Sequence, residues 1–528
     1  MAIDNIADKI RAARELREHL LSDRHRPGYH FAMPEDIGRP GDPNGAFYAG
    51  GRYHLMYLYD RRGVDGWKGK GYAWGHISSA DLVHWRHHPD ALLPDDSDGG
   101  IFSGGAFVDD DGTAYLTYWR GNEVNKGTGI GIARSSDRRY ERWEKLRVPS
   151  LDGTEFGILE SAGEGGEVDH LCNADPSNIW KHNGTYYLQA GNLLVLNKFG
   201  REDDSPAHYR GDWVDLFRSR DLRNWQYVHR FYQRRLDNSW TLESEDDMCP
   251  SFLPLPGSRD GGAASGKHLQ LFISHNMGCQ YYVGTYDRDG ERFLPEVHGR
   301  MSWVDNTFFA PEALIDERGR QIMWSWLTDN PAKGIEDALP DGWCGVYGLP
   351  RVLWLGDDER TLHMAPAPEL ERLRCNAQEF ADVSVTDGSA VPLAGIDGRS
   401  CEISVRIDPG SAQQAGLRVR TSPDGSETTL LYYDAAARQL RFDATRSGTR
   451  GRPVLEQAPL ELAAGEALQL RVFIDNSVIE VFANDRQAIT RRVYPDGDAS
   501  DGVALFARGG SAACSAIRAW EMAPANAH

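Results

Sequence analysis

Residues 79–85 read SADLVHW, and residues 219–225 repeat the phrase as SRDLRNW. A degraded copy, SDRRYERW, occupies residues 136–143. Each copy follows a β-like run, at residues 72–77, 129–133 and 213–218. Repetition at a few tens of residues marks an array of one supersecondary unit. Strand-rich units of this size close most naturally into a β-propeller, because radial closure leaves only short sheet edges.

Two strand-rich regions divide the chain, and together they predict an all-β protein. From about residue 28 to about residue 355, short β-rich runs alternate with turn signals such as DPNG at 42–45. We count about five such units, which predicts a five-bladed β-propeller. Residues 376–524 alternate in the strand pattern, most plainly at 468–474 and 478–483, and predict a C-terminal β-sandwich.

Four segments are therefore expected. They are an N-terminal helical extension at 1–27, the five-bladed propeller at 28–364, a linker at 365–375 and the sandwich at 376–528. Residues 5–21 predict an amphipathic helix, because apolar residues recur there at helical spacing: Ile6, Ile10, Ala13, Leu16 and Leu20. We expect this helix to pack on the outside of the main domain, with a dimer contact as the alternative.

The composition argues against several classes of protein. A length of 528 residues is too great for a single core, so two domains are expected. The formal charge of −20 argues against a nucleic-acid partner, since proteins that bind nucleic acid carry basic faces. No apolar run approaches the roughly 20 residues of a membrane helix, so no membrane partner is expected. The 15 Trp and 21 Tyr residues suit carbohydrate recognition and propeller cores alike.

The cysteines and the first residues indicate a compartment. The seven cysteines are odd in number and form no CxxC pair, so neither a disulfide framework nor a zinc knuckle is predicted. Reduced thiols fit a cytoplasmic protein. The N-terminus lacks the basic-then-apolar order of a signal peptide, and we therefore expect a cytoplasmic location.

Acidic residues at the starts of successive units are the candidate chemical groups. Asp42 lies in a turn that leads into an apolar run, and Asp175 precedes Pro176 just before another run. The alternative for either residue is a turn-forming role. A third group, at 243–247, contains Glu245 and Asp246 and leads directly into an apolar strand. Strand starts in a propeller line its axis, so we expect these acids to converge.

Converging carboxylates suit glycoside hydrolysis. One ionised acid attacks the anomeric carbon, while another acid with a raised pKa protonates the leaving oxygen. Like charges held close push the two pKa values apart, which assigns the roles. A metal site is the rival use of such acids. Because no histidines stand at ligand spacing, no transition metal is expected, whereas a structural calcium remains open. No cofactor is predicted.

Short motifs follow one another along the chain. They are GDPNG at 41–45, WGHISSADLVHW at 74–85, GIFSGG at 100–105, NADP at 173–176, FFAPE at 308–312 and VFIDNSVIEVFAN at 472–484. In this order they resemble glycoside hydrolase family 32, the invertases, levanases, inulinases and related β-fructosidases. The resemblance implies that Asp42 is the nucleophile and that Asp175 stabilises the transition state by binding fructose hydroxyls. It also implies substrate contacts by Asn44, Trp74, Phe102, Ser103 and Glu312.

The chain departs from the family pattern near the expected site. Gly41 replaces an Asn, Ala174 replaces an Arg, and Leu58 stands where many members have Gln. Met248 replaces the acid of the family's Glu-Cys-Pro motif, and methionine has no proton to donate. The resemblance therefore leaves the proton donor to be found among the nearby acids Glu245, Asp246 and Asp247, or leaves the chain without one.

Two arguments point to different donors. Strand alternation would put Asp246 on the same side as Met248. A bulge would instead deliver Glu245, whose longer side chain reaches further. We favour Glu245 as the general acid, because the pattern Glu-Asp-x-x-Cys-Pro resembles a variant branch of the family. Asp305 and Glu312 are candidates for tuning the pKa of the donor.

The leading hypothesis is a retaining glycosidase that acts on β-fructofuranosides, such as sucrose, fructo-oligosaccharides or fructans. A fructosyltransferase, including one that forms a cyclic difructose, keeps the chemistry and changes the acceptor. An inactive fructoside-binding protein is the alternative from another class, and the altered motifs motivate it. A five-bladed arabinan-type hydrolase is a fourth hypothesis, against which the sandwich motif weighs. The expected partner is a small carbohydrate substrate, and a homo-oligomer remains open.

Overall fold

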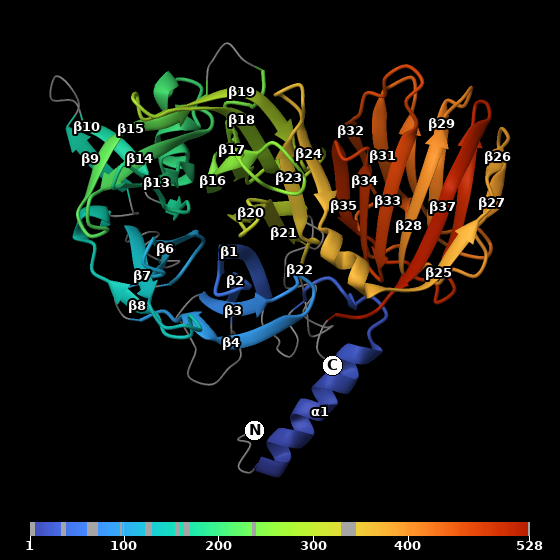
Figure 1. Ribbon diagram of the computed structural model, residues 1–528, viewed down its shortest axis with the longest axis horizontal. Coiled ribbons are helices and arrows are strands. Elements are labelled where there is room, and N and C mark those ends of the chain that lie inside the picture. The colour runs from blue at the N-terminus through green and yellow to red at the C-terminus, as the bar shows by residue number, and fades with distance from the viewer. Residues whose placement is uncertain are drawn as a thin grey trace. The chain divides into compact units, whose positions relative to one another are not determined.

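The fold is that of a computed structural model of the chain (Figure 1). It describes residues 6–32, 39–60, 72–95, 98, 100–121, 129–153, 158–162, 168–172, 174–234, 239–328 and 345–525. Two compact units make up the chain: one contains Met1–Ile37, Leu327–Leu349 and His363–His528, and the other contains Gly38–Trp326 and Pro350–Leu362. The segment boundaries expected from the sequence stay a prediction.

Antiparallel sheets build the unit that begins at Gly38. The first has the order β1-β2-β3-β4, with β1 Arg39–Ala49, β2 Arg52–Asp60, β3 Ala73–Ser79 and β4 Trp85–Leu92. The second contains β5 Ala106–Val108, β6 Ala114–Arg120, β7 Gly129–Ser135 and β8 Glu144–Leu146. The third contains β11 Ala174–Pro176, β12 Trp180–His182, β13 Thr185–Gly191, β14 Trp213–Ser219 and β15 Trp225–Gln233.

Two further sheets and a hairpin complete this set. The fourth sheet has the order β16-β17-β18-β19, with β16 Met248–Pro256, β17 Ala264–Ser274, β18 Gly278–Asp287 and β19 Arg292–Arg300. The fifth contains β20 Phe308–Ile315, β21 Gln321–Leu327, β22 Val346–Tyr347, β23 Arg351–Leu355 and β24 Leu362–Pro366. The hairpin pairs β9 Ile158–Ala162 with β10 Val168–Cys172.

The sheets stand around a common centre. In Figure 1, the labels of β1, β16 and β20 lie toward the middle of this unit, and those of β4, β8, β15 and β19 lie toward its rim. The first strands of neighbouring sheets lie against one another, as β1 does with β20 and β16 does with β11. The predicted all-β class is confirmed, and the arrangement is that of a β-propeller. The described residues form five such sheets here, and the blade count stays a prediction.

The repeated phrase of the sequence forms the turn between the last two strands of a sheet. The Asp81 carboxylate accepts a hydrogen bond from the backbone N–H of His84 at 2.9 Å, and Asp221 accepts one from Asn224 at 2.8 Å. The following Leu82 and Leu222 have φ of 63° and 61°, in the left-handed region. These carboxylates therefore satisfy turn N–H groups, which explains why the phrase recurs at this turn in three of the sheets.

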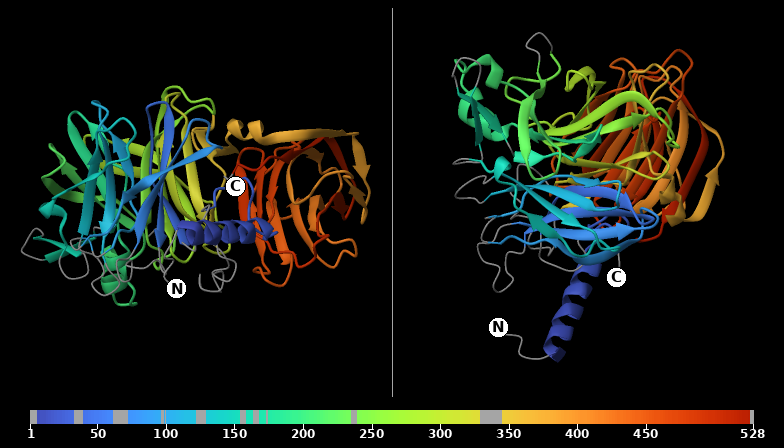
Figure 2. Two further views of the ribbon diagram at one scale, coloured as in Figure 1. Left: turned by 90° about the horizontal axis from the view of Figure 1, so that it is seen from below. Right: turned by 60° about the vertical axis from the view of Figure 1, so that its left-hand side comes forward.

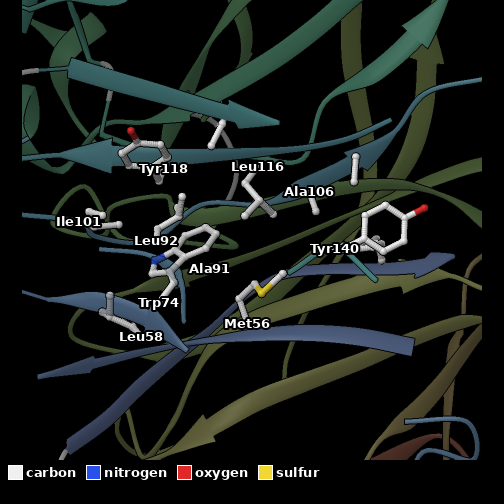
Figure 3. Close-up of a cluster of buried hydrophobic side chains, with 13 residues drawn as sticks. Met56, Leu58, Trp74, Ala91, Leu92, Ile101, Ala106, Leu116, Tyr118 and Tyr140 are labelled. Carbon is white, nitrogen blue, oxygen red and sulfur yellow. The ribbon is translucent and has the colours of Figure 1, made fainter. Parts of the chain in front are cut away.

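Large apolar side chains fill the space between neighbouring sheets. Met56 on β2 and Trp74 on β3 pack against Leu116 and Tyr118 on β6 (Figure 3), and each of the four is 1% exposed or less. Gly131 on β7 permits this packing, because a Cβ there would lie 2.2 Å from the Tyr118 ring. Burial of such aromatic and aliphatic groups supplies the main favourable term in folding.

Two further sheets form the unit that contains residues His363–His528 (Figure 2). One contains β25 Arg374–Phe380, β26 Val383–Val385, β28 Ser400–Asp408, β33 Leu468–Asp475, β34 Val478–Ala483, β35 Gln487–Arg492 and β37 Ala512–Met522. The other contains β27 Ala390–Pro392, β29 Gln414–Thr421, β30 Thr428–Asp434, β31 Gln439–Arg446, β32 Leu455–Pro459 and β36 Gly502–Arg508. Residues on β33 and β34 pair antiparallel, as their alternating sequence predicts. The architecture is the predicted sandwich.

Helices are few in the described part of the chain. The helix α1, Ile6–Ser22, confirms the amphipathic helix predicted at 5–21. Its Leu20 is buried, whereas Ile6 and Leu21 are exposed, and the dimer contact stays a prediction. The short helices are η1 Pro149–Leu151, α2 Leu193–Val195, η3 Leu196–Gly200, η4 Ala207–Tyr209 and η6 Pro368–Leu373. Within the described residues, no helix has both the length and the apolar character needed to span a membrane.

Candidate active site

The inner strands share one local construction at the centre of the sheets. A residue followed by proline occurs in β1, β11, β16 and β20, as Asp42-Pro43, Asp175-Pro176, Cys249-Pro250 and Ala310-Pro311. The strand register shifts around the first three of these sites. Such irregularities bend a strand and re-aim its side chains. The residue before each proline is therefore the one that this fold directs toward its neighbours.

Backbone strain marks three of these positions. Asp175, Cys249 and Ala310 have φ of 41°, 49° and 46°, although none is glycine. A residue that precedes proline normally stays in the extended region. Left-handed backbone at such residues costs free energy, which the surrounding structure must supply, and it clusters at functional sites. The strain is thus a reason to look for chemistry at these side chains.

Two carboxylates meet at one sulfur atom. The Cys249 thiol lies 3.4 Å from Asp175 Oδ2 and 3.7 Å from Asp42 Oδ2. The hydroxyl of Ser103, on the segment before β5, also donates to Asp42 Oδ2. Asp42 and Cys249 are partly exposed, and Asp175 is 6% exposed. The structure therefore brings together Asp42, Asp175 and Ser103, as the sequence predicts, and adds Cys249.

Burial and mutual repulsion keep protons on this cluster. Burial raises the pKa of Asp175 to about 7, and the charge of Asp42 contributes to the shift. Burial also raises the pKa of Asp42, against the hydrogen bond from Ser103. The pKa of the Cys249 thiol rises well above its usual value through burial and both carboxylates. Near neutral pH, Asp42 is therefore the better candidate for an ionised nucleophile, and Cys249 remains a neutral donor.

Asp246 lies beside a histidine that the sequence analysis overlooked. Its Oδ2 is 2.6 Å from His275 Nδ1, and its Oδ1 accepts the backbone N–H of the same residue at 3.1 Å. The Asp246 side chain is 1% exposed, whereas that of His275 is 46% exposed. Desolvation lowers the pKa of His275, but Asp246, Asp175 and Asp42 together raise it above its ordinary value. His275 therefore keeps its proton to higher pH than an ordinary histidine does.

Glu245 has different surroundings from those of its neighbour. It is fully buried, and its two oxygens lie 2.8 and 3.1 Å from the guanidinium nitrogens of Arg300. Gln280 donates to one of them at 2.7 Å, and the backbone N–H of Leu242 donates to the other at 3.0 Å. A carboxylate with four donors around it acts as an acceptor. These contacts describe a structural ion pair rather than an acid poised to give up a proton.

Met248 itself is buried in the fold. It is 1% exposed, and its Sδ lies 3.4 Å from the backbone N–H of Leu193. Because β16 begins at Met248, the preceding acids lie outside the strand, and the strand alternation invoked for Asp246 does not apply to them.

Asp247 is also buried, accepts a hydrogen bond from Gln270 at 2.6 Å, and has a pKa raised well above its usual value by burial.

The residues expected to contact substrate fall into two groups. Phe102 is partly exposed, and its ring centroid lies 4.8 Å from that of Trp119 and 5.6 Å from that of Tyr72. The next residue, Ser103, donates to Asp42. A partly exposed aromatic group suits the apolar face of a sugar.

The other three expected contacts are buried and brace the cluster. Asn44 donates to the backbone oxygen of Asp42 at 2.8 Å and accepts the N–H of Gly104 at 3.0 Å. Trp74 donates its Nε1–H to the Phe102 carbonyl at 3.1 Å. Glu312 accepts the backbone N–H of Ala46 at 2.8 Å, and burial raises its pKa well above the usual value. These side chains hold Asp42, Phe102 and the neighbouring strands in place.

Cys249 and His275 are the two site residues that sequence reasoning missed. The signal for Cys249 was present, since Cys249-Pro250 repeats the pattern of Asp42-Pro43 and Asp175-Pro176. His275 has no such signal. Among the described residues, no group of three or more His, Cys, Asp or Glu has the geometry of a metal site.

Comparison with known families places this site in context. The model of the glycosyl hydrolases family 32 N-terminal domain matches residues 30–366, and that of the glycosyl hydrolases family 32 C terminal matches residues 369–521. The chain belongs to glycosyl hydrolases family 32. Sucrose-6-phosphate hydrolase from Zymomonas mobilis is a relative with 31% identity, over 98% of this chain and 96% of the relative.

Other similarities agree with the family 32 assignment. Levanase from Bacillus subtilis is 29% identical, over 92% of this chain and 68% of the relative. Fructan 1-exohydrolase IIa from Cichorium intybus has a similar fold, with a TM-score of 0.79 at 22% identity, over 96% of this chain and 98% of that one. Sucrose-6-phosphate hydrolase from Lactobacillus gasseri has a TM-score of 0.73 at 20% identity, over 99% and 98% of the two chains.

The departures from the family 32 pattern follow a rule in this structure. Gly41, Ala174 and Met248 each stand immediately before one of the three clustered residues, Asp42, Asp175 and Cys249. Leu58 lies beside Gly41, since a Cβ on Gly41 would lie 3.4 Å from Leu58 Cδ2. Apolar groups thus replace polar ones at all three equivalent positions, while the clustered residues stay polar.

Proposed function

We propose that the protein is a retaining glycosidase that hydrolyses β-fructofuranosides. One observation carries the proposal: in a family 32 chain, Asp42 and Asp175 converge on the Cys249 thiol from different sheets. Glycosidic hydrolysis with retention needs a carboxylate nucleophile, a role that Asp42 fits.

The proposed reaction has two steps. Asp42 attacks C2 of the fructosyl unit, the glycosidic bond breaks, and the leaving oxygen receives a proton. Water then attacks the covalent fructosyl ester and releases fructose with retained configuration. Asp175 holds fructose hydroxyls during both steps and stabilises the oxocarbenium-like transition state. Ser103 donates to Asp42 and so keeps the nucleophile oriented.

Relatives suggest the class of substrate. Their names specify sucrose 6-phosphate, levan and fructan, which share a terminal β-fructofuranosyl group. Phe102, Trp119 and Tyr72 form an aromatic cluster, and Phe102 is next in sequence to Ser103, which donates to the proposed nucleophile. We propose that the sugar ring packs on this aromatic cluster, with Phe102 and Ser103 contacting it, while Asn44, Trp74 and Glu312 support these groups from behind.

The test measures fructose released from sucrose, 1-kestose, inulin and levan by the purified full-length protein. NMR taken during the first minutes should show the β-anomer before mutarotation. The Asp42→Asn variant should release none, whereas Asp260→Asn, an exposed Asp of the same unit, should match the wild type. Longer oligosaccharides or cyclic difructose at high substrate concentration would instead identify a transferase. Fructoside binding without turnover would identify an inactive binding protein.

The remaining proposals concern organisation and location. We propose an N-terminal helical extension, a catalytic propeller, a short linker and a sandwich, at the boundaries expected from the sequence; the two family models meet between residues 366 and 369. A cytoplasmic location is supported by free cysteines, which include Cys249, Cys279 and Cys401. A homo-oligomer remains a hypothesis that sedimentation would test.

A further inference from the structure

The proposed reaction lacks a proton donor at the position where family 32 carries one. Methionine occupies position 248 and points its sulfur at the backbone N–H of Leu193. The alternative favoured from the sequence, Glu245, is held by Arg300 and Gln280. A leaving alkoxide still needs a proton, because an alkoxide is a poor leaving group near neutral pH. Another group in the cluster must therefore supply it.

His275 lies at the end of the fourth sheet that faces the cluster. It follows Ser274 at the end of β17, and β17 pairs with β16 so that Ile273 lies opposite Met248. Extending that register by two residues brings His275 opposite Asp246. The histidine thus lies at the same end of the fourth sheet as Cys249, whose thiol contacts both clustered carboxylates.

The imidazole is fixed on one side and open on the other. Nδ1 lies 2.6 Å from Asp246 Oδ2, the ring packs edge-on against Phe309 at 5.6 Å between centroids, and the carbonyl of His275 accepts from Asn306 at 2.7 Å. Within the described residues, no side chain hydrogen-bonds Nε2. With 46% of the side chain exposed, Nε2 is the ring nitrogen available to a substrate.

We propose that His275, oriented by Asp246, is the general acid and base of this enzyme and replaces the acid that Met248 displaces. Asp246 is a positioning residue in this arrangement. It fixes the tautomer by accepting from Nδ1–H, so that the other proton resides on Nε2. The inference rests on the proposed fructosidase function and assigns its missing donor.

The proton balance closes with histidine in this role. Asp42 forms a bond to C2 as the bond from C2 to the leaving oxygen breaks, and the proton of His275 Nε2 passes to that oxygen. Neutral His275 then takes a proton from the attacking water, whose oxygen bonds to C2 while the ester bond to Asp42 breaks. Fructose and the released alcohol leave, and both side chains return to their starting states.

The charges around His275 favour the protonated starting state. Asp246, Asp175 and Asp42 are the negative groups that act on the ring, and they raise its pKa. The same proton lowers the pKa of Asp42 and of Asp175, which helps Asp42 to stay ionised. A histidinium therefore fits a site with several carboxylates better than another acid would.

The main test compares two leaving groups in the full-length protein. His275→Ala and His275→Gln should lower kcat/KM on sucrose, or on whichever natural fructoside the wild type cleaves best, by about 10²- to 10⁴-fold. On p-nitrophenyl β-fructofuranoside, whose leaving group needs no proton, the same variants should lose less than about tenfold. His19→Ala, on the exposed face of α1, is the matched control and should change neither value. Circular dichroism checks that the variants fold.

Equal losses on both substrates, or no loss on the natural one, would overturn the assignment of His275. A selective loss in Glu245→Gln instead would give the role to Glu245. A wild type that cleaves neither substrate would reject the proposed function itself, which separates the two failures.

A pH profile tests the positioning role of Asp246. Asp246→Asn removes a negative partner of the imidazolium, so the basic limb of kcat/KM on the natural substrate should move to lower pH. A purely structural role would reduce activity at every pH and leave the limb in place, which would contradict the proposal.

Discussion

The starts of β1 and β16 use the same backbone construction for different chemistry. In β1 the residue before proline is Asp42, and in β16 it is Cys249; the strand register shifts at both. Both side chains reach the same cluster, yet one offers a carboxylate and the other a neutral thiol. The fold therefore decides where the side chain points, and the residue type decides what the position can do. It also follows that β16 must obtain its proton donor from outside the strand.

The largest loss of activity should come from substitution of Asp42, the carboxylate at the start of β1. Asp42→Asn keeps the shape of the side chain and removes the nucleophile. We expect kcat to fall by about 10⁴-fold or more on natural and nitrophenyl fructosides alike, because loss of a nucleophile stops both. Initial rates on both substrates check this. A variant that kept most of its activity on either would show that β1 does not supply the nucleophile.

A smaller loss of activity is expected from substitution of Asp175, the equivalent residue in β11. Asp175→Asn should lower kcat by on the order of 10²- to 10³-fold, the range for removing one preorganised contact to the transition state. The KM should change much less. Steady-state kinetics check the split, and a change confined to KM would mean that Asp175 binds the ground state only.

The same variant has a predicted effect on stability. Burial raises the pKa of Asp175 from 3.8 to about 7, so between these values the folded protein keeps a proton that the unfolded chain has lost. The free energy of unfolding should therefore fall as pH rises from about 4 to 7, by up to a few kcal/mol. Asp175→Asn should flatten this slope and be the more stable protein at pH 8. Urea denaturation at pH 4.5, 6 and 8 measures it, and an unchanged slope would contradict the assignment.

The fold was largely predictable because its signals are local. The repeated phrase contains its own turn, in which Asp81 and Asp221 bind N–H groups two or three residues away. The meeting of Asp42 and Asp175 was also predictable, since it follows from where the inner strands begin. Such features need only the sequence near each residue and the general architecture of a propeller.

The proton donor was harder to predict because the partners of Glu245 and Asp246 are distant in sequence. Glu245 pairs with Arg300 at the end of β19, and Asp246 pairs with His275 in the turn after β17. The sequence around residues 243–247 contains no sign of either pairing. Tertiary contacts give these two neighbouring buried acids different environments, and the local sequence alone could not tell which acid has which environment.

The contrast between these two neighbours gives the next prediction. Glu245→Gln leaves the Arg300 guanidinium without its anionic partner; Glu245 is 0% exposed and Arg300 is 13% exposed. We expect the free energy of unfolding to fall by about 3–5 kcal/mol, the range for breaking a buried ion pair from one side. Glu144→Gln, in the exposed pair with Arg134, is the matched control and should change stability little. Chemical denaturation of both variants decides this. A stable but inactive Glu245→Gln would instead support a catalytic role for Glu245.

The smallest loss of activity is expected from substitution of the Cys249 thiol. Burial and the charges of Asp175 and Asp42 raise the pKa of Cys249 well above its usual value, so the thiol reacts slowly and serves as a weak hydrogen-bond donor. Cys249→Ala should lower kcat by less than about tenfold. In the wild type, iodoacetamide at pH 7.5 should modify the exposed Cys375 well before Cys249, as peptide mass spectrometry would show. Rapid alkylation of Cys249, with loss of activity in step, would mean that β16 supplies a reactive thiolate, and the two strands would then both carry an anion into the cluster.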